Sequence, residues 1–86
     1  MPFTPEEEEH AWELVEGDYR ERGLQLPTQE RLDLQEFLVD YLLCAQEGQG
    51  LLRAFHGGTA TLEHKAALKS LFDYLVNDYL TAELAP

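Results

Sequence analysis

The chain's length of 86 residues fits one domain, residues 1–86, with one modest hydrophobic core. Its 17 acidic and 6 basic residues give a formal net charge of −11, which argues against direct binding to nucleic acid or an anionic membrane and favours a basic protein partner. No apolar run reaches the roughly 18 residues of a membrane span, and the first ten residues, MPFTPEEEEH, lack the apolar segment of a cleaved secretion signal.

The first predicted helix begins after Thr4 and runs to about Arg22. Thr4 is suited to cap the helix, Pro5 to occupy its first position, and Glu7 to complete a capping box. Gly23 is a natural stop for this helix. Its apolar face is formed by Ala11, Trp12, Val15 and Tyr19. A separate acidic face is formed by Glu6, Glu9, Glu13 and Glu16.

The second predicted helix is capped by Thr28 and contains the most apolar stretch of the chain, residues 32–45. Its apolar positions do not alternate, which excludes a strand. They form two stripes, and a helix with two apolar stripes is touched from two sides. The broad stripe consists of Leu34, Phe37, Leu38, Tyr41, Leu42 and Ala45, and the narrow one of Leu32, Val39 and Leu43. Between them lies an acidic stripe of Asp33, Glu36, Asp40 and Glu47.

A break is predicted near Gly48, because Gly48 and Gly50 together would cost a continuous helix about 2 kcal/mol relative to alanine. A short helix over residues 51–56 then precedes the turn at Gly57-Gly58. The last helix begins after Thr59 or Thr61 and runs to about Thr81, and residues 82–86 are expected to fray. Its apolar face consists of Leu68, Leu71, Phe72, Leu75, Val76 and Tyr79. The predicted fold is an all-α bundle of three long helices with a short helix at 51–56.

Catalytic and metal-binding patterns are weak in this sequence. Glu7 and His10 have the spacing of a bundle metal ligand pair, but no second pair accompanies them. Cys44 is predicted to be a buried, structural thiol on the apolar side of its helix. No phosphate-binding loop or serine nucleophile motif is present. We therefore expect no enzyme activity, no cofactor and no metal, and the single cysteine favours a reducing cytoplasm.

The charge pattern leads to the functional hypothesis. Like charges along one helix face repel one another by a few tenths of a kcal/mol per pair, so a basic partner would relieve them. We expect a non-enzymatic acidic helical protein that regulates or inhibits a basic protein partner. The predicted partner-binding residues are Asp33, Glu36, Asp40, Glu47, Glu9, Glu13 and Glu16. The alternative is a homo-oligomeric structural or assembly component, such as a homodimer, in which Leu32, Val39 and Leu43, or Trp12 and the tyrosines, pair between copies. A metal-dependent enzyme assembled between subunits is a third hypothesis.

Overall fold

Residues 3–83, which the computed structural model describes, form four helices and no strand. These are α1 (Pro5–Arg22), α2 (Thr28–Cys44), α3 (Gln46–His56) and α4 (Leu62–Glu83). The predicted all-α bundle is thereby confirmed. None of the four helices of this described part combines the length and the apolar composition needed to cross a lipid bilayer. Part of the tail that was predicted to fray, residues 84–86, lies outside the described residues.

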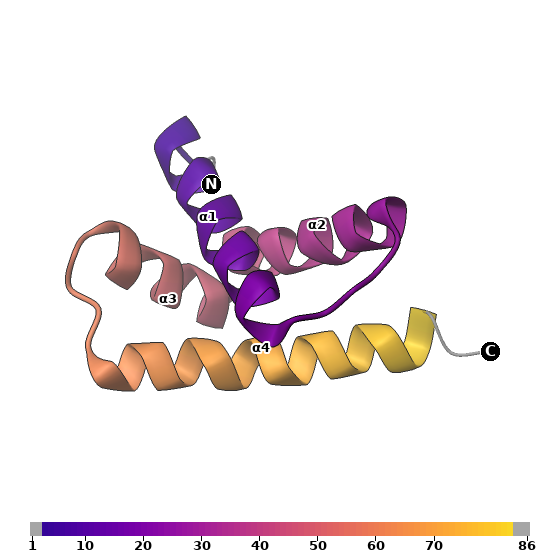
Figure 1. Ribbon diagram of the computed structural model, residues 1–86. Coiled ribbons are helices and arrows are strands. Elements are labelled where there is room, and N and C mark those ends of the chain that lie inside the picture. Colours follow the sequence, from indigo (N-terminus) through magenta and orange to yellow (C-terminus); the bar gives the residue numbers. More distant parts are fainter. Residues whose placement is uncertain (1–2, 84–86) are drawn as a thin grey trace.

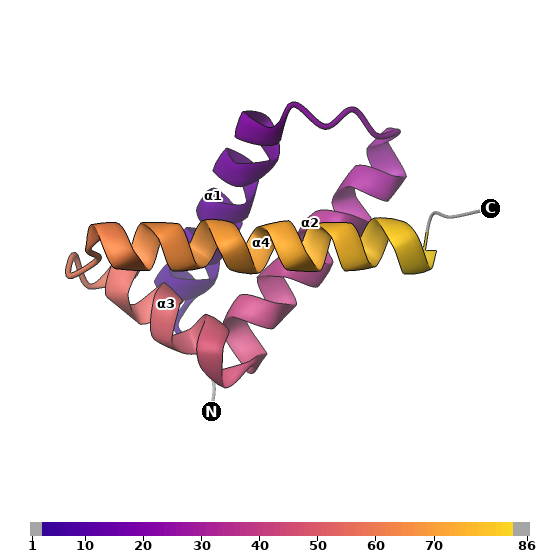
Figure 2. The same ribbon diagram turned by 90° about the horizontal axis from the view of Figure 1, so that it is seen from below.

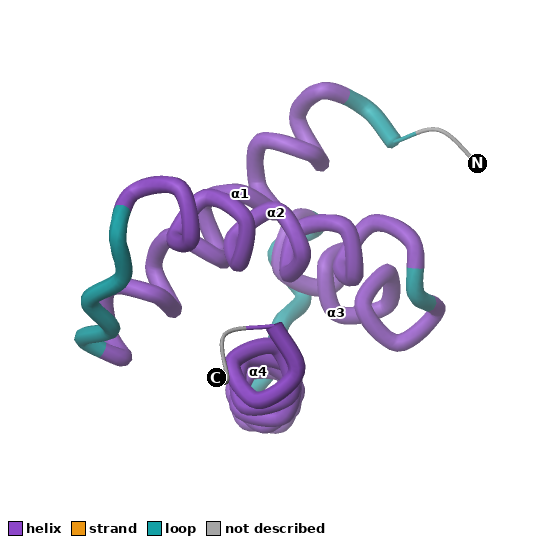
Figure 3. The backbone as a smooth tube through the Cα atoms, turned by 90° about the vertical axis from the view of Figure 1, so that its right-hand side faces the viewer, coloured by secondary structure: helices purple, strands orange, loops and turns teal. Residues whose placement is uncertain are grey.

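The helices form two layers. α1, α2 and α3 lie together in one layer, and the long α4 crosses beneath them (Figure 1). The view from below shows α4 running across the other three helices (Figure 2), and the end-on view separates the two layers (Figure 3). The core lies between the layers, and every helix contributes to it. Its buried apolar residues are Ala11, Val15, Leu34, Leu38, Val39, Leu42, Leu51, Leu52, Leu71, Phe72, Leu75 and Val76.

The two ends of α1 follow the sequence prediction. Oγ1 of Thr4 accepts a hydrogen bond from the backbone N–H of Glu7 at 3.1 Å, and Oε1 of Glu7 accepts one from the N–H of Thr4 at 3.1 Å. These reciprocal bonds satisfy two N–H groups that no helical carbonyl can reach. At the other end Gly23 adopts a φ of 68°, a left-handed conformation that glycine takes without steric cost.

α2 packs against α1, α3 and α4, so the predicted contact on more than one side is confirmed, but the narrow stripe does not form a separate surface. Val39 is 2% exposed and belongs to the same core as Leu34 and Leu38, whereas Leu32 is 42% exposed. Gln35 lies between the two stripes on the surface of α2 and is only 1% exposed, although it is polar. The two stripes therefore form one continuous face. Burial of the Gln35 side chain is tolerated because its amide is satisfied. Its Nε2 donates to Oε2 of Glu16 at 2.7 Å, and its Oε1 accepts from Nε of Arg31 at 3.4 Å.

The break between α2 and α3 falls at Ala45, three residues before the predicted site. Ala45 is extended, with φ −82° and ψ 140°, and α3 starts at Gln46, so the short helix spans 46–56 rather than 51–56. Gly48 is buried inside α3, where a Cβ would overlap the Tyr41 carbonyl oxygen and lie 2.7 Å from Cα of Leu42. The absence of a side chain at Gly48 therefore allows α3 to pack closely against the end of α2.

Gln49 closes the corner between α2 and α3. Its Nε2 donates to the carbonyl oxygen of Leu43 at 2.9 Å. Leu43 lies in the last turn of α2, where carbonyl groups have no partner within the helix. The second glycine of the segment, Gly50, is exposed, and a Cβ there would meet nothing within 4 Å. The two glycines thus have different structural roles.

Candidate functional site

The acidic stripe predicted on α2 lies at the surface. Asp33, Glu36 and Asp40 are exposed, on the side of α2 opposite the buried Leu38. Because the break falls at Ala45, the fourth member, Glu47, is exposed in the first turn of α3. Among residues 3–83 no lysine, arginine or histidine forms an ion pair with any of these four carboxylates. Their charges therefore stand unneutralised in solvent.

The three residues of α1 that were predicted to bind the partner, out of the four on its acidic face, differ in their surroundings. Glu9 and Glu13 are exposed. Glu16 is half-buried at the contact with α2, where it accepts the hydrogen bond from Gln35. Its Oε1 also lies 3.9 Å from Nη2 of Arg31 and 4.0 Å from Nη2 of Arg20. Glu16 therefore stabilises the fold, and part of its charge is already neutralised.

Trp12 lies in a shallow hollow on α1 of roughly 460 Å³, together with three carboxylates and one guanidinium: Glu9, Glu13, Glu16 and Arg20. Gly17 also lines this hollow and has no side chain to fill it. The space beside it is open, since a Cβ at this position would meet nothing within 4 Å. Trp12, predicted on the apolar face of this helix, packs against the core but is only partly buried. The spacing i, i+3, i+4, i+7 puts residues 9, 12, 13 and 16 on one helix flank, and this signal could have predicted the hollow.

A second, larger hollow of roughly 860 Å³ lies between α1 and α4. No pattern within a single helix indicates this hollow, because its lining comes from three helices. Its apolar lining comes from Leu14, Phe55 and Leu68, which belong to three different helices. Four of the six basic residues of the protein also line it, namely Arg20, Arg22, Lys65 and Lys69. Glu13, Asp18 and Glu21 line this groove as well, and Arg20 also lines the hollow around Trp12.

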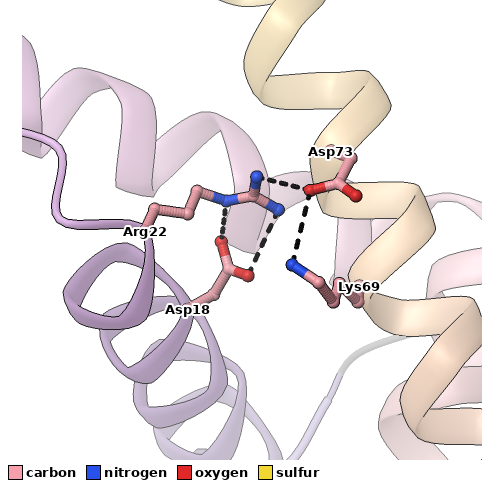
Figure 4. A network of polar contacts seen from close by, with 4 residues as sticks. All are labelled: Asp18, Arg22, Lys69 and Asp73. Carbon is pink, nitrogen blue, oxygen red and sulfur yellow. Dashed lines mark hydrogen bonds and ion pairs between the residues drawn. The ribbon is translucent and has the colours of Figure 1, made fainter.

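Arg22 joins α1 to α4 at this groove (Figure 4). Its Nε donates to Oδ2 of Asp18 at 2.7 Å, and its Nη1 donates to Oδ1 of Asp73 at 2.5 Å. Nζ of Lys69 lies 3.9 Å from the same Asp73 oxygen. The hydrogen bond from Arg22 holds the pKa of the Asp73 carboxyl below its ordinary value.

Replacing Asp73 by asparagine is expected to reduce stability at neutral pH and to lose this effect in acid. Since the folded protein lowers the pKa of Asp73, the unfolded chain binds its proton more readily. The contribution of the ion pair is therefore fully present above the ordinary aspartate pKa of about 4 and is lost as the pH falls through the lower, folded value. Urea unfolding between neutral and acidic pH measures the difference between wild type and Asp73→Asn.

The control for this experiment is Asp78→Asn, which removes an exposed carboxylate from the same helix. Asp78 makes no ion pair with any residue of the described chain. A gap between wild type and Asp73→Asn that stayed constant into strong acid, or that Asp78→Asn reproduced, would contradict the assignment to the Arg22–Asp73 pair.

The three histidines and Cys44 do not gather into one cluster. No group of three or more His, Cys, Asp or Glu side chains suited to a metal ion occurs within residues 3–83. His10 lies beside His56, with 3.3 Å between their Nδ1 atoms, whereas His64 accepts a hydrogen bond from the N–H of Thr61 at 3.0 Å. Cys44 is exposed, so its prediction as a buried thiol is wrong. As the last residue of α2 it falls where the helix leaves the core.

Comparison with family models, with curated proteins and with solved structures finds no match for this chain.

Proposed function

We propose that this chain is a non-enzymatic binding protein that regulates or inhibits a basic protein partner. The observation that carries the proposal is the hollow on α1 in which the three carboxylates of Glu9, Glu13 and Glu16 outnumber the one cation, Arg20, beside Trp12. Carboxylates attract lysine and arginine side chains, and the face of an indole binds the same cations through its quadrupole. Tryptophan is also enriched among the residues that dominate binding energy at protein interfaces.

The acidic stripe of Asp33, Glu36 and Asp40 on α2, together with the exposed Glu47 on α3, supports the same proposal in another way. These carboxylates are exposed and form no ion pair within residues 3–83, although Asp33 accepts a hydrogen bond from Gln29 at 3.0 Å, so they produce a negative field without a cost of desolvation. Such fields mainly accelerate the encounter with an oppositely charged partner and contribute less to the final affinity. We assign anchoring to the Trp12 hollow and steering to the α2 stripe.

The alternative of assembly between copies has weaker support. Its narrow apolar seam was Leu32, Val39 and Leu43, but Val39 is 2% exposed and already packs in the core of its own chain. The seam is therefore not free as a unit to pair with a second copy. Pairing through Trp12 and the tyrosines stays a prediction, and of these side chains Tyr74 is 68% exposed.

Trp12 is the only tryptophan in the chain, so its fluorescence reports directly on the hollow. We expect an arginine-rich peptide to change this emission in a saturable way at low salt. The same peptide with neutral citrulline in place of arginine is expected to leave the emission unchanged. Raising the salt from about 50 to 300 mM should weaken binding about tenfold or more, because charge attraction at the surface is screened.

Charge-matched variants locate the binding. Glu9→Gln with Glu13→Gln is expected to weaken the peptide about tenfold, because two carboxylates no longer attract its cations. The control, Glu63→Gln with Asp78→Asn, makes the same change in net charge on exposed residues of α4 and should bind like wild type. If both double variants were weakened equally, the binding would depend on the net charge of the protein and not on the Trp12 hollow. If the arginine and citrulline peptides bound equally well, the proposal would be overturned.

The natural partner is to be sought by affinity purification from the native cell and mass spectrometry. We expect wild type and the control variant, Glu63→Gln with Asp78→Asn, to recover the same basic protein. The variant Glu9→Gln with Glu13→Gln is expected not to recover it. Recovery of acidic proteins only, or of a basic protein whose affinity ignores ionic strength, would contradict the proposal.

A further inference from the structure

Two histidines from distant parts of the chain meet at one end of the α1–α3 contact. His10 lies in the second turn of α1, and His56 is the last residue of α3. Their Nδ1 atoms are 3.3 Å apart, and the two rings meet edge to face, with centroids 5.4 Å apart and planes inclined by 70°. The sequence offered only the pair Glu7 and His10, and folding adds a second imidazole to it.

The separation of the two nitrogens suits a shared metal ion. Two nitrogen ligands at about 2.0–2.1 Å from a tetrahedral ion lie about 3.3 Å from each other. His56 is exposed and His10 is half-buried, so solvent has access to the pair. A shared ion replaces the hydrogen bond that the two Nδ1 atoms form with each other. Neither ring belongs to the hydrophobic core, so small rotations of these side chains suffice to aim both nitrogen lone pairs at one ion.

The charges around the pair also bear on a cation. Glu7 precedes His10 by one helical turn, and its charge interacts with both His56 and Arg53. Its carboxylate is already held by the capping box with Thr4, so it contributes negative charge rather than a ligand bond. Arg53 opposes this charge, but its guanidinium is drawn toward the ring of Phe3, at 5.9 Å from the centroid.

We propose that His10 and His56 bind a divalent transition-metal ion through their Nδ1 atoms and thereby join α1 to α3. Imidazole pairs favour zinc, nickel and copper, whereas magnesium and calcium require oxygen ligands. Water completes the coordination, because the protein supplies two ligands. An ion that binds only the folded chain stabilises it in proportion to its occupancy. This inference is independent of the proposed basic partner.

The test is thermal unfolding with and without zinc, nickel or magnesium, in a Cys44→Ser background that removes the exposed thiol as a competing ligand. Zinc and nickel are expected to raise the unfolding temperature, and magnesium to leave it unchanged. His10→Gln and His56→Gln should each abolish the zinc shift. His64→Gln is the matched control and should retain it, because this third histidine is occupied with Thr61.

Calorimetry and NMR give readouts that do not depend on stability. Zinc affinity should fall at least tenfold in His10→Gln and in His56→Gln, and zinc should shift the Nδ1 resonances of both rings together in the Cys44→Ser protein. A zinc shift that survives in either variant, or that His64→Gln removes, would overturn the site. Absence of any zinc or nickel effect in the Cys44→Ser protein would overturn it as well.

Discussion

Replacing Phe72 by alanine is expected to lower the free energy of unfolding by about 3–5 kcal/mol. Phe72 is 0% exposed and is among the largest fully buried side chains of the core between α4 and the other three helices. Truncation removes the transfer free energy of the ring and leaves a cavity that packed neighbours can fill only in part. Chemical denaturation followed by far-UV circular dichroism measures the loss.

The matched control for Phe72 is Tyr74→Ala on the same helix. Tyr74 is 68% exposed, and its replacement should change stability by no more than about 0.5 kcal/mol. Because domains of this size have only about 5–10 kcal/mol of stability, Phe72→Ala can leave a large unfolded fraction. Phe72→Leu, which retains most of the volume, is expected to lose about 1.5 kcal/mol. Equal effects at positions 72 and 74 would contradict the packing of α4.

Gly48→Ala is expected to destabilise the protein by about 2–3 kcal/mol, although alanine is the better helix former. The new Cβ would overlap the Tyr41 carbonyl oxygen and lie 2.7 Å from Cα of Leu42. Both obstacles belong to the backbone, so no side-chain rotation relieves them. The α2–α3 corner must open, and the urea midpoint is expected to fall accordingly.

Gly50→Ala provides the internal control two residues further along α3. Its Cβ would meet nothing within 4 Å, and it should raise stability by roughly 0.5–1 kcal/mol through helix propensity. The two substitutions are chemically identical and are expected to act in opposite directions. If both raised stability, the close approach of α3 to the end of α2 would be refuted.

Local features of the fold could be predicted from the sequence, and features that depend on other helices could not. The cap at Thr4, the stop at Gly23 and the apolar face around Phe72 follow from residue types and spacing within one segment. The break at Ala45 does not, because the reason for Gly48 is the backbone of α2 against which it packs. Gln35 was likewise unpredictable, since its burial depends on Glu16 of another helix.

The candidate sites divide in the same way. The acidic stripe on α2 is exposed, as helical periodicity indicated, and its binding role stays a prediction. The hollow around Trp12 could have been predicted from spacing alone, because all its acidic members lie on α1. The meeting of His10 with His56 required the fold, since the two residues are 46 positions apart and share no sequence motif.

The corner between α2 and α3 has a consequence for the order in which the chain folds. Gln49 bonds to a carbonyl only six residues away, and Gly48 packs against residues equally near in the sequence. Closing so short a loop costs little chain entropy, whereas the contact between Arg22 and Asp73 must bring together residues 51 positions apart. The corner can therefore form early, before the two ends of the chain have met, and offer a template on which α1 and α4 assemble.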